Sequence, residues 1–343
     1  MKLKAKIPYI LIAFSLFSIF LLCLARIFPS TTMGINSIIC TPVRNLLSIL
    51  TSPLPFSVFE MFILISPILI ILAIRYVIHG NKDFGKRFFS IIALISLFPT
   101  LYILTLGISY KAAIAFNEYE SRADIGEIVC VANILTAEIS EMDEAGKDVP
   151  TLSEIADDLS ESYSRILHAY GTKDVYLPKP KPLILSSLMS KLGILALYSF
   201  PTGEVNINTD IPAYMIPFTL AHEYAHKVGA AGEAEANFLA FLACRASDSA
   251  YIRYSGNLSV LEYFLNDIAQ NNGQMYKEVY KTLPPSALSD ISLYREYYEK
   301  NSGSLLFSAS DKINSAHLNT WDPNGSSSYS KVTVYVTHYL IYA

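Results

Sequence analysis

The stretch TLAHEYAHKVGAAGEAEANFLAFLAC, from Thr219 to Cys244, decides how the central part of this chain folds. It contains the motif H-E-x-x-H, in which His222 and His226 are four residues apart. On a helix this spacing places both side chains on one face, where they can bind the same metal ion. Glu223 lies beside the first histidine, where it can act as a general base on a metal-bound water. The alternative is an ordinary helix whose two histidines pack or face solvent.

A catalytic zinc ion needs three protein ligands and one open position, so a third ligand must come from elsewhere in the chain. If the helix simply continued, Glu233 would share a face with His226 but lie about 10.5 Å further along the axis. That is too far for zinc, whose bonds are about 2 Å long. We therefore expect the chain to reverse. Gly229 is suited to end the first helix and Gly232 to begin the next, which predicts a tight helical hairpin.

Two glutamates, Glu233 and Glu235, lie in the first turn of the second predicted helix. Acidic residues at a helix N-terminus also stabilise the helix dipole, which explains both without a metal. The pattern E-x-x-A-N, from Glu233 to Asn237, resembles the glutamate helix of gluzincin metallopeptidases. The resemblance implies that Glu233 binds zinc and that Asn237 orients a zinc-binding histidine. Glu235 points about 200° away on the same helix and is the alternative ligand.

The first 110 residues are typical of a membrane unit. The chain is 52% hydrophobic and only 16% charged, whereas soluble domains have about a quarter charged residues. Its mean hydropathy is +0.35. Three apolar stretches predict transmembrane helices at about 7–27, 57–78 and 88–110. The first could instead be a cleaved signal peptide, but the sequence LCLARIF has no A-x-A cleavage site, so we expect a retained helix.

The orientation follows from the positive charges of this membrane unit, residues 1–110, which contain 9 Lys/Arg and 2 Asp/Glu. The N-terminal segment and the loop between the second and third predicted helices hold Lys2, Lys4, Lys6, Lys82, Lys86 and Arg87. The loop from Pro29 to Phe56 has only Arg44. Because cytoplasmic segments carry the excess of Lys/Arg, both basic segments are predicted to be cytoplasmic. We therefore expect a multi-pass protein of the cell membrane with residues 111–343 outside the cytoplasm.

The remainder of the chain is predicted to be mostly helical. The pair Thr151 and Glu154 and the pair Ser259 and Glu262 both have the spacing of a capping box, so each is expected to begin a helix. The last stretch, SYSKVTVYVTHYLIYA, is compatible with a strand or a helix, because its β-branched residues oppose its helical pattern.

A short strand is predicted immediately before the H-E-x-x-H helix. The segment GEVNIN, residues 203–208, alternates apolar and polar side chains between turn residues. Metallopeptidases often hold an extended substrate against such a strand when it lies at a sheet edge. A purely structural strand is the alternative.

The composition excludes two classes of function. Residues 111–343 contain 17 Lys/Arg and 28 Asp/Glu. Nucleic acid is therefore not an expected partner, because phosphate contacts need a basic face. The four cysteines form no CxxC pair, which indicates neither a disulfide framework nor a cysteine metal site.

A wider resemblance covers nearly the whole chain. The three N-terminal helices, LPFSVFE, PTGEVNINTD and the H-E-x-x-H hairpin together resemble the bacterial membrane family catalogued as domain of unknown function 3810. The expected fold is mainly α: three transmembrane helices in residues 1–110 precede a mostly helical, extracytoplasmic, zincin-like domain with a short β-segment before the H-E-x-x-H helix. The resemblance implies a gluzincin-like zinc peptidase. The connection of six residues between His226 and Glu233 is shorter than is usual in gluzincins.

The sequence therefore predicts a zinc-dependent peptidase anchored in a lipid bilayer, which acts on a peptide or protein substrate. The predicted ligands of Zn²⁺ are His222, His226 and Glu233. Glu223 is the predicted general base. His317, His338 or one of the many tyrosines could assist by stabilising the oxyanion, and the sequence does not choose between them. The alternative is a membrane-anchored binding or structural protein whose zinc only stabilises the hairpin.

Overall fold

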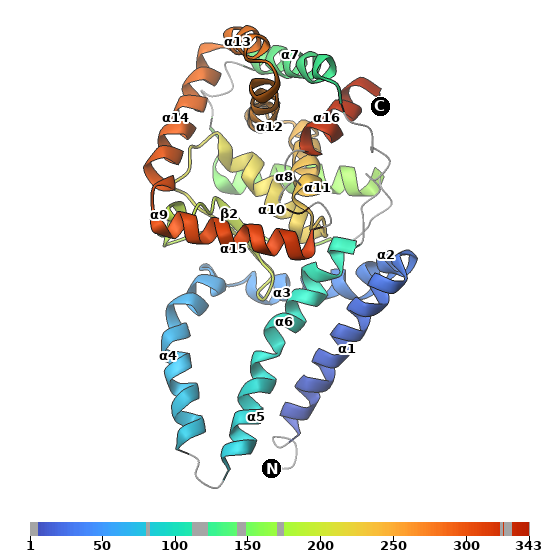
Figure 1. The fold of residues 1–343 in the computed structure, drawn as a ribbon, viewed down its shortest axis with the longest axis vertical. Helices are drawn as coiled ribbons and strands as arrows, with labels where there is room; N and C mark the ends of the chain where they lie inside the picture. Colours follow the sequence, from blue (N-terminus) through green and yellow to red (C-terminus); the bar gives the residue numbers. More distant parts are fainter. Residues whose placement is uncertain are drawn as a thin grey trace. The chain divides into compact units, whose positions relative to one another are not determined.

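The computed structural model describes residues 6–79, 83–111, 123–142, 149–169, 175–322, 325 and 331–342. Two compact units make up the chain, and both are mainly helical (Figure 1). The first unit consists of Met1–Ala112 and Ser199–Glu204, and the second of Ala113–Tyr198 and Val205–Ala343. Three of the basic residues used to predict the orientation lie outside the described residues, namely Lys2, Lys4 and Lys82.

The first unit contains the long apolar helices. Its α-helices are α1 (Ile7–Ile27), α2 (Thr32–Ile35), α3 (Thr41–Thr51), α4 (Val58–Ile78), α5 (Phe84–Ile95) and α6 (Leu97–Tyr102). α6 continues into a π-helical turn, Ile103–Gly107, so that α5, α6 and this turn form one long apolar run. α5 and α6 pack against α1, and α4 packs against α5.

Within the described residues, four helical stretches are long and apolar enough to cross a membrane: Ile7–Ile27, Pro29–Thr51, Val58–Ile78 and Phe84–Gly107. The sequence predicted three, and the segment that begins at Pro29 was expected to be a loop. Its mean hydropathy is 1.2, against 2.1 to 2.5 for the other three stretches. Polar residues and Arg44 interrupt it, so it lacks the continuous apolar run that identifies a span in a sequence.

A buried arginine, Arg44, organises the interior of the first unit. Its guanidinium donates to Thr105 O at 2.7 Å and to Ser109 Oγ at 3.0 Å. It also donates to Asn36 Oδ1 at 3.1 Å and to Thr41 Oγ1 at 2.9 Å. Ser109 Oγ in turn donates to Asn36 Oδ1 at 3.0 Å. These bonds hold the polar side chains of the Pro29–Thr51 segment next to the C-terminal end of the Phe84–Gly107 helix.

α4 exposes apolar side chains along most of its length, and its buried residue is Glu60. The exposed side chains include Phe62, Ile63, Leu64, Ile65, Ile68, Leu69, Ile70, Ile71, Leu72 and Ile74. A soluble protein rarely exposes a contiguous apolar surface of this extent. The helix is therefore suited to a membrane, where lipid is the solvent and backbone polar groups are paired within the helix.

The second unit is a helical domain with one small sheet. Its helices are α7 (Ile125–Glu141), α8 (Leu152–Ala169), α9 (Ser186–Lys191), α10 (Met215–Val228), α11 (Glu233–Arg245), α12 (Ala250–Asn271), α13 (Gly273–Lys281), α14 (Pro285–Ser302), α15 (Leu305–Trp321) and α16 (Lys331–Tyr342). α10, α11 and α12 pack on one another, and α7 packs on α12 (Figure 1). Apolar side chains of these helices, such as Phe241 and Phe264, are fully buried and form the core.

The sheet has three strands in the order β1-β3-β2, with bounds β1 (Lys181–Pro182), β2 (Ala196–Ser199) and β3 (Glu204–Ile207). β1 pairs with β3 in parallel, and Lys181 lies opposite Asn206. β3 is the predicted strand, but it lies in the centre of the sheet and all four of its residues are buried. The prediction that it could offer an edge to a substrate is therefore wrong. The edge strands are β1 and β2.

The predicted helix starts have mixed outcomes. Thr151 and Glu154 form the predicted capping box, since the Thr151 amide donates to Glu154 Oε2 at 2.8 Å and the Glu154 amide to Thr151 Oγ1 at 3.3 Å. Ser259, by contrast, lies inside α12, which begins at Ala250. The N-cap of α12 is Ser249, whose side chain accepts from the Ile252 amide. Gly256 inside the helix allows close packing on α11, since a β-carbon there would lie 2.4 Å from Cys244 Cβ.

The described part of the ambiguous C-terminal stretch is helical, and residues 328–330 and 343 lie outside the described residues. Residues Lys331–Tyr342 form α16, whose buried side chains include Val332 and Val336, one turn apart. α16 packs against α11, α12 and α7. Tertiary packing of this apolar stripe therefore overrides the strand preference of its β-branched residues.

Candidate metal centre

α10 and α11 form the predicted helical hairpin. α10 ends at Gly229, which has a left-handed φ of 114° that favours glycine. The Ala230 amide donates back to Ala225 O at 2.9 Å, which closes the end of α10. Gly232, in extended backbone conformation, is the N-cap of α11. The predicted reversal between the two helices is confirmed.

The hairpin brings His222, His226 and Glu233 together. His222 Nε2 lies 3.4 Å from Glu233 Oε2, and His226 Nε2 lies 3.7 Å from Glu233 Oε1. One potential ligand atom from each of the three residues lies within 4.8 Å of the others. Among the residues that the structure describes, this is the one group of three or more His, Cys, Asp or Glu side chains with such a geometry.

The other ring nitrogen of each histidine faces an acceptor. His222 Nδ1 lies 2.9 Å from Asn237 Oδ1, and His226 Nδ1 lies 2.8 Å from Ala230 O. An acceptor at Nδ1 favours the tautomer that carries its proton there, which leaves the Nε2 lone pair for a metal ion. Both rings are therefore oriented with Nε2 toward Glu233.

The spacing and exposure of the three side chains fit zinc. Four ligands at about 2 Å from a tetrahedral ion lie about 3.3 Å from one another. The separations of 3.4 and 3.7 Å between the histidine nitrogens and the carboxylate oxygens are close to this value. The three side chains are 14–16% exposed. Three side chains of these types could hold a zinc ion and would leave one of its four positions to a ligand from outside the cluster.

The charges of the site favour a bound cation. Burial lowers the pKa of His222, but the carboxylates of Glu233 and Glu223 outweigh it and raise this pKa to about 9. The site thus stabilises positive charge at His222 in the absence of any other cation. A divalent metal can replace that proton, because metal binding and protonation compete for the same nitrogen lone pair.

Glu223 is buried beside this cluster, with 7% of its surface exposed. Its Oε2 accepts a hydrogen bond from the backbone amide of Tyr198, the third residue of β2, at 2.5 Å. Burial raises the pKa of Glu223, and the neighbouring His222 and His226 oppose this rise.

Glu235, the alternative ligand, is not part of the cluster. Its Oε2 lies near Gly232, 3.1 Å from the position of an added β-carbon, and Asp322 Oδ2 lies 3.5 Å from the same position. Burial, together with the charge of Asp322, raises the pKa of Glu235 to about 7. Asp322 also accepts a hydrogen bond from the Glu233 amide at 3.4 Å, and so caps the start of α11.

Two further side chains lie close to the cluster. Tyr263 of α12 lies near enough to Glu233 and Asn237 for both to act on the pKa of its hydroxyl, which burial raises. His317 of α15 is near enough to Glu233 and His226 for both to act on its pKa, which burial lowers. His338 contacts the ring of Tyr342 instead, with 5.3 Å between the ring centroids. No sequence motif marks Tyr263, because its position depends on the packing of α12 against α11.

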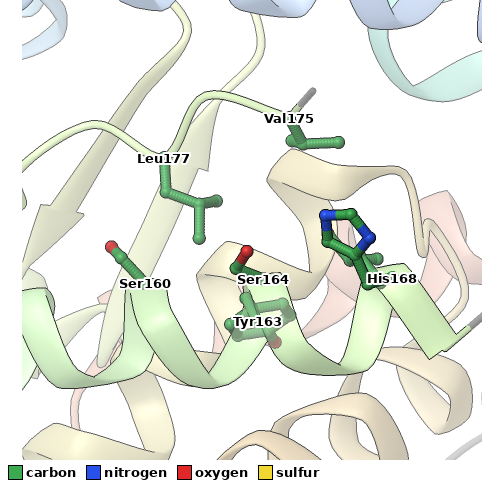
Figure 2. Close-up of a pocket in the computed structure, with 7 residues that line it drawn as sticks. Ser160, Tyr163, Ser164, His168, Val175 and Leu177 are labelled. Carbon is green, nitrogen blue, oxygen red and sulfur yellow. The ribbon is translucent and has the colours of Figure 1, made fainter. Parts of the chain in front are cut away.

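A separate pocket of about 230 Å³ lies along α8. Figure 2 shows Ser160, Tyr163, Ser164 and His168 on that helix, with the side chains of the segment at Val175 and Leu177 nearby. None of the three clustered side chains lines it. It is connected to the site only indirectly, since the Tyr163 hydroxyl donates to the backbone of α10, at the carbonyl of the residue before His222.

Comparison with known proteins places the chain in a family. A family model described as "Protein of unknown function (DUF3810)" matches residues 36–337, which is most of the chain. The match includes the H-E-x-x-H hairpin and Asn237. No curated protein and no solved structure matches the chain. The chain therefore belongs to the DUF3810 family of proteins of unknown function.

Proposed function

We propose that the protein is a membrane-anchored, zinc-dependent peptidase. The observation that carries this proposal is the convergence of His222, His226 and Glu233 beside the buried carboxylate of Glu223. These three side chains would hold the ion with one position open. Zinc in such a site lowers the pKa of a bound water toward 7 and polarises a substrate carbonyl.

The protein's own groups have distinct roles in this proposal. Glu223 accepts the proton that the nucleophilic water loses and later gives it to the departing amine. The Tyr198 amide, which donates to Glu223 Oε2, holds this carboxylate in one orientation. Asn237 and the carbonyl of Ala230 fix the tautomer of the two histidines.

The proposed reaction is tested with three variants of the full chain in detergent micelles. Glu223→Gln is expected to retain the zinc content of the wild type and to lose peptidase activity by about 10²–10⁴-fold. Glu233→Gln is expected to lose both zinc and activity. Glu235→Gln is the matched control from the same helix, and it is expected to retain both. Zinc is measured by mass spectrometry, and activity with a broad peptide library.

Three outcomes would contradict the proposal or its choice of ligand. Zinc in the wild type without cleavage of any peptide would favour a binding or structural protein in which the metal only stabilises the hairpin. A wild-type protein that binds no zinc would exclude both interpretations. Equal loss of zinc in Glu233→Gln and Glu235→Gln would leave the choice of ligand wrong.

We further propose three membrane crossings, with the catalytic domain outside the cytoplasm. In this arrangement the segment Pro29–Thr51 is helical but does not cross. Its low hydropathy and the bonds of Asn36 and Arg44 to the same hydroxyl, Ser109 Oγ, support a position at one membrane face. If Pro29–Thr51 also crossed the membrane, the second unit would lie on the same side as the N-terminus, which is the cytoplasm in this arrangement.

The chain carries its own reporter of this topology. Cys130 on α7 is exposed, whereas Cys244 in the same unit is buried. Cys23 on α1 is also exposed, so the test uses a Cys23→Ser background. A thiol reagent that does not cross membranes is expected to label this protein in intact cells stripped of their outer layers, and the further change Cys130→Ser is expected to abolish the labelling. Labelling only after the membrane is permeabilised would show that the domain is cytoplasmic.

A further inference from the structure

The segment Ser199–Glu204 contains the last residue of β2, the connection to β3 and the first residue of β3, and is called the Ser199–Glu204 loop. It belongs to a different unit from its neighbours in the chain. Tyr198 and Val205 belong to the second unit, whereas the loop belongs to the first unit with Met1–Ala112. β2 and β3 therefore both cross the division between the units. The hydrogen bonds and packing that hold this loop are made with α3, α4 and α6 of the first unit.

Glu204 fixes one end of the loop to α4. It is only 1% exposed. The Val58 amide donates to Glu204 Oε1 and the Phe59 amide to Glu204 Oε2, each at 2.9 Å. The first amides of a helix have no partner within it, and a helix N-terminus attracts negative charge. Both oxygens of the carboxylate thus form charge-assisted hydrogen bonds with the start of a membrane helix.

α3 and α6 hold the rest of the loop. Ser48 Oγ donates to Gly203 O at 2.6 Å, and Thr51 Oγ1 donates to Thr202 O at 3.1 Å. Gly203 has a φ of +70°, and a β-carbon there would lie 2.5 Å from Ser48 N, so the approach requires glycine. The Phe200 ring packs against two aromatic rings of α6, with centroid distances of 4.7 and 5.3 Å.

The residue that precedes this loop contacts the candidate general base. Tyr198 is joined to Ser199 by one peptide bond, and its amide donates to Glu223 Oε2. Because each peptide plane is rigid, only the φ and ψ torsions of Tyr198 separate its amide from the peptide bond to Ser199. A displacement of Ser199 is therefore transmitted to the Tyr198 backbone and changes the hydrogen bond to Glu223.

We propose that Glu204 is a positioning residue for Glu223. By binding the start of α4, Glu204 holds the Ser199–Glu204 loop, and the loop holds the Tyr198 amide where it orients the carboxylate of Glu223. This inference rests on the proposed function, in which Glu223 is the general base. Glu204, in the first unit, acts on Glu223, in the second, only through the backbone from Ser199 to Tyr198 that joins them. Misplacing a catalytic group by about 1 Å costs about 10²-fold in rate.

The test uses the full chain in detergent micelles and compares Glu204→Gln with the wild type. Hydrogen–deuterium exchange, resolved to single amides by mass spectrometry, reports the Tyr198 hydrogen bond whether or not the protein is active. We expect exchange at this amide to rise by about tenfold or more, as the hold on the loop weakens. We also expect kcat to fall by about tenfold or more, with KM and zinc content unchanged.

Two other variants keep the test decisive. Ser48→Ala removes one hydrogen bond to the loop and leaves α4 intact, so it replaces Glu204→Gln if that variant does not fold. It is expected to change exchange and kcat in the same direction by a smaller factor. Glu154→Gln is the matched control, because Glu154 also accepts from a backbone amide at a helix start but in the second unit. It is expected to leave the Tyr198 amide and kcat unchanged.

The possible failures are distinguishable. If exchange at Tyr198 is unchanged while the Val58 and Phe59 amides exchange faster, the loop does not hold Tyr198 and the inference is wrong. If Tyr198 exchanges faster but kcat is unchanged in an active wild type, Glu204 does not position the base. An inactive wild type would overturn the proposed function, and with it the positioning role, while the exchange data would still decide the mechanical link.

Discussion

The two units of the molecule differ in the apolar surface that they expose. In the first unit the apolar side chains of α4 are exposed, and the fully buried side chains include Arg44 and Ser18 as well as Ile108. In the second unit Phe238 and Phe264 are fully buried, and the charged residues lie mostly at the surface. The exposed apolar surface of the first unit suits lipid, whereas burial of apolar surface stabilises the second unit in water.

The largest change in the free energy of unfolding is expected from a substitution in the apolar core of the second unit. Phe264→Ala should lower the free energy of unfolding by about 3–5 kcal/mol, because it removes a buried ring and leaves a cavity. Ile70→Ala on α4 is the comparison in the first unit, where the side chain is 58% exposed. It should change stability by less than about 0.5 kcal/mol in micelles or lipid. Thermal unfolding of both variants measures the contrast, and equal effects would show that α4 packs against protein.

A slightly smaller effect is expected from the polar interior of the first unit. Arg44→Met should cost about 3 kcal/mol, because it leaves the buried acceptors of the guanidinium without their donor. The control is Lys86→Met, which removes an exposed ion pair with Asp83 and should cost about 0–1 kcal/mol. Unfolding in lipid nanodiscs measures both. A stabilised Arg44→Met protein would mean that the first unit has an ordinary apolar core.

The buried carboxyl of Glu262 should make the second unit sensitive to pH. Burial raises its pKa to about 7, although the Tyr214 hydroxyl donates to it at 2.8 Å. Because the pKa is higher in the folded state, the contribution to stability is present below about pH 4.5 and is lost as the pH rises through 7. The loss is on the order of 3 kcal/mol.

The measurement for Glu262 is a difference between two proteins. Unfolding of the wild type and of Glu262→Gln is compared from pH 4.5 to 8, because Glu235, with a pKa of about 7, titrates in the same range in both. The stability of the wild type should fall relative to the variant across this interval. Parallel curves would show that Glu262 is ionised throughout.

The smallest expected change is in the zinc affinity of the site formed by His222, His226 and Glu233. Asn237→Ala should weaken zinc binding by about 10–100-fold, because the orienting acceptor at His222 Nδ1 is lost. Asn237→Asp, which retains an oxygen acceptor, should bind zinc more tightly than Asn237→Ala. Competition with a zinc-binding dye measures both affinities. Equal affinities of all three proteins would exclude an orienting role for Asn237.

Local patterns predicted much of this protein. The helices Ile7–Ile27 and Val58–Ile78 are long apolar runs, so the sequence predicts them from hydropathy alone. The hairpin followed from Gly229 and Gly232, because each glycine has a backbone position that suits a helix end. Given that reversal, Glu233 was within reach of the histidines.

Features that depend on distant residues could not be predicted. The helical segment from Pro29 is stabilised by bonds of Arg44 to residues more than sixty positions away. Ser259 has the spacing of a cap, but α12 begins earlier, at the N-cap Ser249, and its central part packs closely on α11 at Gly256. Tyr263 could not be distinguished from the other tyrosines in the sequence, because its position near Glu233 depends on the packing of α12.

Three of the four long apolar helices, the hairpin and the two histidines on one face were predictable, because each rests on a pattern of residues close together along the chain. The meeting of Glu233 rather than Glu235 with the histidines, the central place of β3 and the grouping of the Ser199–Glu204 loop with the first unit were not. These features depend on which surfaces pack together, and packing joins residues whose separation along the chain carries no local signal.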